Sequence, residues 1–234
     1  MQDGKLLLIS SSNVHGYGYL DCAEAEIRDH VGPVQNVLFV PYAIRDYDGY
    51  HARVQSRLQA MGLSTDSIHR ASDPKEAVRN AETIFIGGGN TFRLLKTLYD
   101  LDLLDAIRAR IEAGGRYIGS SAGTNVACPT IRTTNDMPVV EPPSLTALGL
   151  VSFQINPHYL DPDPNSKHMG ETREERIREY LEENDRAVIG LREGAMIRVQ
   201  DDQILLKGIA AARIFRRGHD PVELQPVADL VPYL

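Results

Sequence analysis

Short apolar runs alternate with longer amphipathic segments along the first half of the chain. The apolar runs predict strands over residues 5–10, 36–41, 64–69, 83–87 and 116–120. The segments between them predict helices over residues 19–31, 50–61, 74–80, 91–99 and 101–113. Strands that alternate with helices in this way are typical of a parallel sheet covered by helices on both faces. We therefore expect an α/β fold with a mostly parallel central sheet flanked by helices.

The second half of the chain has a different pattern. Prolines are frequent over residues 129–163, where we expect irregular chain, and long loops in compact domains are often functional. A helix is predicted over residues 173–183, and short strands over residues 187–191, 195–199, 203–206 and 211–215. Because α/β folds of 234 residues often form one unit, we expect a single domain, residues 1–234, around one sheet with extra short C-terminal strands.

Two helix starts carry capping signals. Asp73 can cap the helix at 74–80, Pro74 suits its first position, and Glu76 has the spacing of a capping box. Thr172 and Glu175 have the same spacing at the start of the helix at 173–183. We therefore expect both helices to begin at these positions.

Composition and charge exclude several classes of partner. The net charge of −7 and a pI near 5.5 give no overall attraction to phosphate backbones or anionic membranes. Only two cysteines occur, Cys22 and Cys128, so a reducing compartment fits better than a disulfide framework. The apolar run at residues 6–10 is too short for a signal-peptide core or a membrane span. We expect a cytoplasmic monomer or homodimer that binds neither nucleic acid nor membranes.

The strongest chemical signal is the pentapeptide Gly119-Ser120-Ser121-Ala122-Gly123, which lies between a predicted strand and a segment that can be helical. This context is the one that a G-x-S-x-G nucleophile elbow requires. Glycines two residues before and after the serine remove side chains that would clash in the strained turn. Only Ser121 has both offsets, so we identify it as the candidate nucleophile. Taken alone, the pentapeptide is equally compatible with a tight turn that has no chemical role.

A second glycine cluster, Gly87-Gly88-Gly89-Asn90-Thr91, also ends a predicted strand and opens a helix. Such a loop can bring bare backbone amides close to a phosphate or to the oxyanion of a tetrahedral intermediate. The cluster lacks the lysine and hydroxyl residue of a P-loop, and its glycines do not fit G-x-G-x-x-G. It therefore favours an oxyanion role, with a simple turn as the remaining interpretation.

A serine nucleophile needs a base, for which histidine is the usual residue. His158 is the first candidate because it follows an apolar segment at 153–155, where α/β active sites are built, and His168 is the second. Asp136 and Glu193 are both candidates for the carboxylate that orients the imidazole. Metal ligation competes poorly, since the chain has no His-x-x-x-His or Cys-x-x-Cys spacing. We expect no metal and no organic cofactor.

Four segments carry a resemblance beyond these generic motifs. They are IFIGGGNTFRLLK, YIGSSAGTNVACPTIRTTNDMP, QINPHY and GETREERIREYL, in this order. The chain resembles the peptidase E (α-aspartyl dipeptidase) family over residues 6–193. This resemblance implies a serine peptidase with a class I glutamine amidotransferase-like fold that hydrolyses dipeptides with an N-terminal aspartate. One departure is Ser120, because family members often have tryptophan before the nucleophile, and this puts a detailed transfer of the pocket shape in doubt.

The resemblance also implies roles for single residues. Ser121 is the expected nucleophile and His158 the expected base, with Asp136 as the first choice for the orienting carboxylate and Glu193 as the second. The expected oxyanion donors are the amides of the glycine loop, at Gly88 or Gly89, together with the amide of Ala122.

Selection for aspartate requires a cation or several donors that face its carboxylate, ideally an arginine. We assign Arg173 to this role first and Arg132 second, with Asn90 as a further substrate-binding residue.

Two other functions remain open from the sequence. The first is a cyanophycinase-like hydrolase of β-aspartyl linkages, which shares this fold and elbow but needs an extended groove for a polymer. The second is a non-catalytic small-molecule binding module, in which the glycine loops hold a phosphate or carboxylate and Ser121 is only a turn residue. Activity on α-linked against β-linked substrates separates the first from a dipeptidase, and covalent labelling of Ser121 argues against the second.

Overall fold

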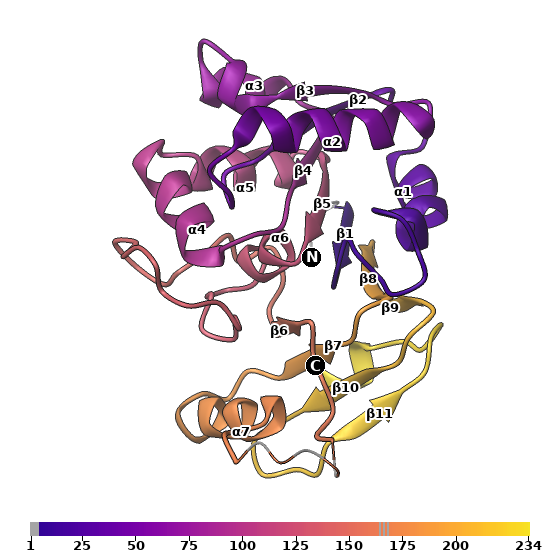
Figure 1. The fold of residues 1–234 in the computed structure, drawn as a ribbon, viewed down its shortest axis with the longest axis vertical. Coiled ribbons are helices and arrows are strands. Elements are labelled where there is room, and N and C mark those ends of the chain that lie inside the picture. Colours follow the sequence, from indigo (N-terminus) through magenta and orange to yellow (C-terminus); the bar gives the residue numbers. More distant parts are fainter. Residues whose placement is uncertain (1–4, 164, 166, 168) are drawn as a thin grey trace.

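The main sheet has seven strands, five of them parallel (Figure 1). A computed structural model describes residues 5–163, 165, 167 and 169–234. The parallel strands are β1 (Lys5–Ile9), β2 (Asn36–Val40), β3 (Ser64–Ser67), β4 (Thr83–Ile86) and β5 (Arg116–Ser120), and the antiparallel strands are β8 (Ala195–Gln200) and β9 (Gln203–Gly208). Their order is β3-β2-β4-β5-β1-β8-β9. The predicted α/β fold with a mostly parallel sheet is confirmed.

Two hydrophobic clusters cover the two faces of this sheet. Successive residues of a strand point to opposite faces, and accordingly Leu6 and Leu8 belong to one cluster while Leu7 and Ile9 belong to the other. One face packs against α1 (Glu24–Val31) and α2 (Tyr47–Ala60). The opposite face packs against α3 (Pro74–Asn80), α4 (Thr91–Asp100), α5 (Leu104–Glu112) and α6 (Ala122–Val126). The central strands are therefore buried on both faces, as their apolar residues require, whereas the edge strands β3 and β9 are partly exposed.

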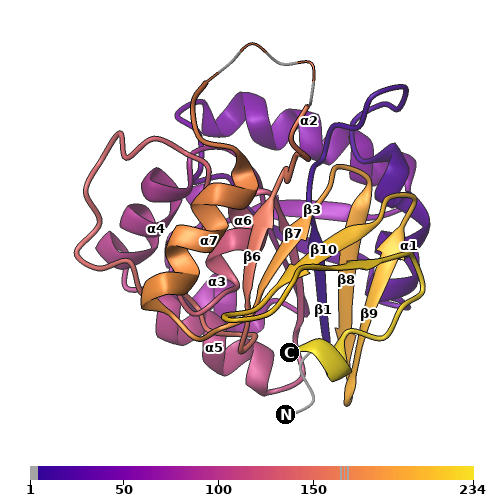
Figure 2. The same cartoon turned by 90° about the horizontal axis from the view of Figure 1, so that it is seen from below.

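A second sheet lies below the first in Figure 1 and in front of it in Figure 2. Its strands are β6 (Gln154–Pro157), β7 (Val188–Leu191), β10 (Ala212–Phe215) and β11 (Val222–Leu224), in the order β11-β10-β7-β6, and α7 (Arg173–Glu183) packs beside it. The expectation of one sheet is wrong. β7 pairs with β6, whereas β8 crosses to pair with β1. Pairing between distant strands has no local sequence signal, which is why the division was not predicted.

Local signals set several element boundaries. Asp73 accepts hydrogen bonds from the amides of Lys75 and Glu76 at the start of α3, and Thr172 forms a complete capping box with Glu175 at the start of α7. α1 begins five residues later than expected, after a 3₁₀ helix at Asp21–Ala23. Two more 3₁₀ helices occur at Ile68–Arg70 and Val231–Tyr233.

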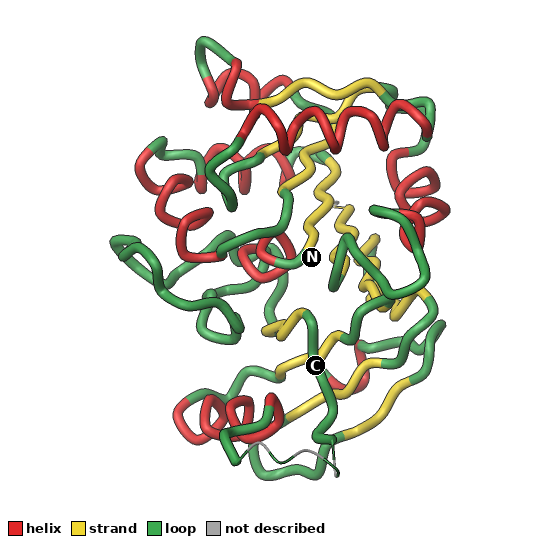
Figure 3. Tube along the Cα trace, in the orientation of Figure 1, coloured by secondary structure: helices red, strands yellow, loops and turns green. Residues whose placement is uncertain are grey.

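A long irregular segment separates α6 from β6 and appears as the green loop at the left of Figure 3. The structure has neither a helix nor a named strand over residues 127–153, in agreement with the proline-rich pattern. Among the described residues, no helix has both the length and the apolar character needed to cross a membrane.

A buried histidine on α1 should make the protein sensitive to acid. Burial, together with the positive charges of Arg198 and Arg116, lowers the pKa of His30 to about 3. In the unfolded chain this imidazole binds a proton near pH 6.5, whereas in the folded chain it stays neutral at that pH. The unfolding free energy is therefore unaffected by His30 above pH 6.5 and falls as the pH drops toward 3. We expect this residue to cost about 2 kcal/mol of unfolding free energy between pH 7 and pH 5.

Urea unfolding at the two pH values measures this cost. His30→Leu should weaken the dependence of the unfolding free energy on pH between pH 7 and pH 5, because leucine cannot bind a proton. An unchanged slope in the variant contradicts the assignment.

Candidate active site

Ser121 sits on a strained turn between β5 and α6. Its φ is +53° and its ψ is −108°, a conformation that costs a non-glycine residue about 1–3 kcal/mol. A Cβ on Gly119 would lie 2.6 Å from the carbonyl oxygen of Gly123, and a Cβ on Gly123 would collide with the carbonyl oxygen of Ile86. The two glycines of the motif are therefore required by close backbone contact, and the turn has the geometry of a nucleophile elbow.

Three side chains form a continuous hydrogen-bonded chain at this turn. Ser121 Oγ lies 2.8 Å from His158 Nε2, and His158 Nδ1 lies 2.7 Å from Glu193 Oε1. The serine follows β5, the histidine follows β6, and the glutamate follows β7, so the site lies where the two sheets meet. His158 also has a positive φ of +54°. This order of hydroxyl, imidazole and carboxylate is that of a serine hydrolase triad.

The contacts reverse the expected order of the two candidate carboxylates. Asp136 was the first choice, but its Oδ2 accepts hydrogen bonds from the amide (2.7 Å) and the hydroxyl (2.6 Å) of Thr91. A carboxylate at this place stabilises the N-terminal end of α4. Glu193, the second choice, is the residue that contacts His158. His168, the second candidate base, lies outside the described residues.

Ser10 holds the backbone at His158, the candidate base, which is a contact that the sequence did not reveal. Its hydroxyl donates to the carbonyl of Leu191 (2.7 Å) and accepts from the amide of His158 (3.0 Å). The Ser10 side chain is fully buried at the end of β1. Because Leu191 ends β7, this single hydroxyl joins the main sheet to the strand ends that carry His158 and Glu193. Its position after the first apolar run was the only available signal.

Side-chain amides tie the irregular segment to β6. Asn125 on α6 donates to the carbonyl of Ile155 (2.9 Å), and Asn156 donates to the carbonyl of Thr133 (2.8 Å). Asn135 in turn donates to the carbonyl of Pro157, directly before the base (2.6 Å). These bonds satisfy buried backbone groups that a loop cannot pair by itself. They also fix the backbone of β6, which directly precedes His158.

The glycine loop lies directly against the nucleophile. A Cβ on Gly88 would be 3.1 Å from Ser121 Cβ, and Gly89 has a φ of +134° and packs on the carbonyl of Ala43. Within the described part of the chain, the amides of Gly89 and Ala122 donate no hydrogen bond. Unpaired backbone amides near a serine hydroxyl are what an oxyanion site needs.

The substrate-binding candidates lie in different surroundings. Asn90 caps α4, where its Oδ1 accepts from the amide of Arg93 and its Nδ2 donates to the carbonyl of Met137. Arg173 lies at the start of α7 and lines a cavity of about 530 Å³. Arg132 is exposed and is not part of that lining. The other lining residues are Asn135, Leu160, Asp161, Pro162, Asp163, Gly170, Glu171, Thr172 and Arg176.

The charge of Arg173 is incompletely balanced. Burial lowers the pKa of Arg173, the neighbouring Arg176 lowers it further, and only Asp136 acts in the opposite direction. A guanidinium in this situation gains from a bound anion. Among the described residues, no group of three or more histidines, cysteines or acids is arranged to hold a metal ion.

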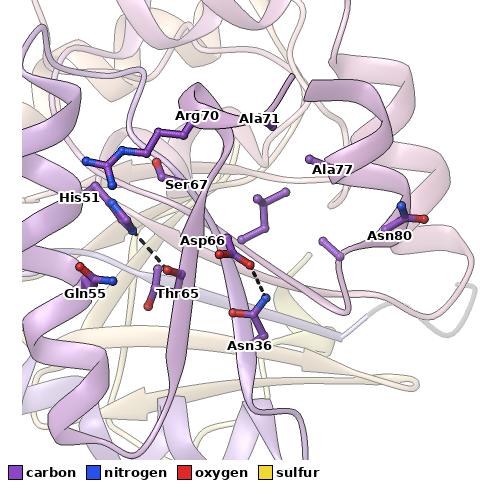
Figure 4. A pocket seen from close by; sticks show the side chains of 12 residues that line it. Asn36, His51, Gln55, Thr65, Asp66, Ser67, Arg70, Ala71, Ala77 and Asn80 are labelled. Atoms are coloured by element: carbon purple, nitrogen blue, oxygen red, sulfur yellow. Dashed lines mark hydrogen bonds between the residues drawn. The ribbon is translucent and has the colours of Figure 1, made fainter. Parts of the chain in front are cut away.

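A second cavity, of about 480 Å³, lies at the free edge of β3, far from this turn in the sheet order (Figure 4). Ser67 in its wall lies 2.7 Å from His69 Nδ1, and His69 Nε2 lies 3.2 Å from Asp48. The backbone of Ser67 is extended, with φ −120°, and its side chain is buried at the end of a regular strand. Ser67 therefore lacks the elbow that presents a nucleophile, and Ser121 remains the candidate nucleophile.

Comparisons with known proteins agree with this geometry. A sequence model described as Peptidase family S51 matches residues 6–207. Peptidase E of Streptomyces coelicolor is 52% identical over 225 residues, which cover 96% of this chain and 93% of that protein. The probable alpha-aspartyl dipeptidase of Drosophila melanogaster is 50% identical over 228 residues, which cover 96% of this chain and 95% of that protein.

Two crystal structures show the same fold at lower identity. A putative peptidase E protein from Listeria monocytogenes superimposes with a TM-score of 0.67 at 24% identity and covers 89% of this chain and 100% of that one. A peptidase from an acI-B1 Actinobacterium gives a TM-score of 0.69 at 18% identity, and the match covers 97% of this chain and 96% of that one. The arrangement of sheets and helices is therefore shared with peptidases.

Proposed function

This chain belongs to peptidase family S51, and from that premise we propose that it hydrolyses α-linked dipeptides whose N-terminal residue is aspartate. Membership makes it a serine-type peptidase. The single observation that carries the proposed mechanism is the hydrogen-bonded chain from Ser121 through His158 to Glu193.

The reaction proceeds in two halves. Ser121 Oγ attacks the carbonyl carbon of the N-terminal aspartate while His158 Nε2 accepts the hydroxyl proton. The tetrahedral intermediate collapses when His158 returns that proton to the leaving amine, which leaves an aspartyl ester on Ser121. His158 then deprotonates a water molecule that attacks the ester, and it returns this proton to Ser121 Oγ as the ester bond breaks and aspartate is released. Glu193 keeps the Nδ1 proton in place and stabilises the imidazolium in both halves.

Two backbone amides stabilise the oxyanion in this mechanism. The amide of Ala122 begins α6, so the dipole of that short helix adds to its polarity. The second donor is the amide of Gly89, which directly follows Gly88, the residue that packs against Ser121. Because these donors are backbone groups of tight turns, they need no reorganisation when the negative charge develops.

Arg173 is the proposed partner of the aspartate side chain. It lines the cavity next to the segment that follows His158, and its charge is partly uncompensated. A planar guanidinium binds a carboxylate through two parallel hydrogen bonds, which a neutral amide side chain cannot match.

Arg173→Gln should lower kcat/KM for Asp-Leu by about 10²-fold to 10³-fold, since a charge-assisted pair is lost in the bound state. The value for Asn-Leu should change little, so the preference for aspartate over asparagine collapses. Steady-state kinetics on the two dipeptides measures both effects. Arg132→Gln is the matched control, because Arg132 is exposed outside the cavity. An unchanged preference in the Arg173 variant contradicts its role.

A substrate panel tests the proposed function as a whole. Wild-type protein is assayed on Asp-Leu, its β-linked isomer, Glu-Leu and Asp-Leu-Leu. We expect release of leucine from the α-linked Asp-Leu alone. Hydrolysis restricted to the β-linked isomer contradicts the proposal and favours a cyanophycinase-like activity.

A further inference from the structure

The His158–Glu193 pair is too exposed to hold its own geometry. The two side chains keep 37% and 44% of their surface in contact with solvent. Ion pairs with this much exposure contribute little and sample many rotamers. The base also occupies a positive φ, which persists only where surrounding contacts enforce it. Contacts outside the pair must therefore fix the two chain segments that carry it, and the backbone contacts of Ser10 are one of them.

Arg192 contacts both of these segments. It directly precedes Glu193, and its Nε and Nη2 donate to the two carboxylate oxygens of Asp161, at 2.7 and 2.8 Å. Asp161 lies three residues after His158, so this bidentate pair joins the strand end that carries the carboxylate to the turn that carries the base. Bidentate geometry is the form in which a partly exposed ion pair fixes structure.

The same guanidinium is anchored to the second sheet. Its Nη1 and Nη2 donate to the carboxylate oxygens of Glu223 on β11, at 2.6 and 3.1 Å. Arg213 on β10 extends the network to Glu174 on α7, at 3.4 Å. The Arg192 side chain is only 20% exposed, so water competes less for these bonds than at an open surface. Arg192 thus joins β11 to the turn that follows His158.

Arg192 also packs on the residue that follows the base. Its Cζ lies 5.5 Å from the centre of the Tyr159 ring. Tyr159 is buried against Phe215, and Gly190 leaves no side chain between that ring and β7. The segment from 158 to 161 is therefore held at three places: the amide of His158, the ring of Tyr159 and the carboxylate of Asp161.

We propose that Arg192 is a positioning residue that holds His158 and Glu193 in register with Ser121. The inference rests on the proposed Ser121 mechanism and adds a residue that does not touch the reacting atoms. The role requires the planar guanidinium, because only that group binds two carboxylates in bidentate fashion and stacks on a ring at the same time. Lysine keeps the charge but loses this geometry.

Arg192→Lys is compared with wild type and with Arg217→Lys. Arg217 is a matched control, since it also pairs with an acid, Asp185, and with a backbone carbonyl at the far end of α7. Four quantities are measured: kcat and KM for Asp-Leu, the rate at which a fluorophosphonate labels Ser121, and the melting temperature. Labelling needs the activated serine but no dipeptide recognition. It therefore tests the positioning role of Arg192 even where the proposed substrate is wrong.

Arg192→Lys should lower kcat and the labelling rate by about 10²-fold, because small misplacements of catalytic groups have effects of this size. KM should stay within about twofold, since substrate contacts are not removed. Arg217→Lys should resemble wild type. A double variant with Asp161→Asn should label hardly more slowly than Arg192→Lys, because the two residues act as one unit. Normal kcat and labelling in Arg192→Lys, with only a lower melting temperature, overturns the proposal.

Discussion

Ser121→Ala should lower kcat by about 10⁴-fold to 10⁶-fold and leave KM nearly unchanged. The hydroxyl that forms the acyl-enzyme is removed, while the elbow, the oxyanion amides and the cavity remain. Alanine is as strained as serine at a φ of +53°, so the variant should fold with similar stability. Steady-state kinetics on Asp-Leu and thermal unfolding measure the two properties.

Ser120→Ala is the matched control for this experiment. Ser120 is the adjacent serine, but its hydroxyl is fully buried and lies 2.6 Å from the hydroxyl of Ser12. Its loss removes a buried hydrogen bond of about 1 kcal/mol and no reacting atom. The control should retain activity within about tenfold of wild type. Loss of activity in the Ser120 variant with retention in the Ser121 variant contradicts the assignment.

The second large effect is expected for Glu193→Gln, which should lower kcat by about 10²-fold to 10⁴-fold. Glutamine can turn its amide NH2 group, a donor, toward His158 Nδ1, where the carboxylate offers only acceptors. It also carries no charge to stabilise the imidazolium. The lower part of this range reflects the solvent exposure of the pair, which weakens its electrostatic contribution. Fluorophosphonate labelling of Ser121 should slow in parallel with kcat.

Asp136→Asn separates the two candidate carboxylates. Asparagine keeps an oxygen that can accept from Thr91, and the residue does not contact His158. Labelling of Ser121 should therefore proceed at nearly the wild-type rate in this variant, whatever its effect on dipeptide binding through Arg173. Slow labelling in Asp136→Asn with normal labelling in Glu193→Gln contradicts the arrangement of the site.

Local features of the site were predictable from the sequence, because their physical causes are local. The elbow at Ser121 follows from two glycines at fixed offsets after a buried strand, and His158 follows from its place beyond an apolar segment. The capping residues Asp73 and Thr172 set helix starts through bonds to amides two and three residues away.

Features that depend on distant contacts were not predictable in this way. The choice between Asp136 and Glu193 depends on which loop reaches His158, and no pattern around either residue records it. The division into two sheets depends on β8 leaving β7 to pair with β1, although both strands have similar apolar patterns. Ser10 has its role only because β1 ends opposite Leu191 and His158.

An aspartyl ester at Ser121 is the central intermediate of the proposed mechanism. An activated aspartyl ester, such as the p-nitrophenyl ester, acylates a serine peptidase faster than water removes the acyl group. Acid quenching within the first turnovers, followed by intact-protein and peptide mass spectrometry, identifies the species. We expect a mass increase of one aspartyl residue that is located on Ser121 and is absent from Ser121→Ala. Turnover of the ester with the adduct on another residue, or an equal burst in Ser121→Ala, would contradict it.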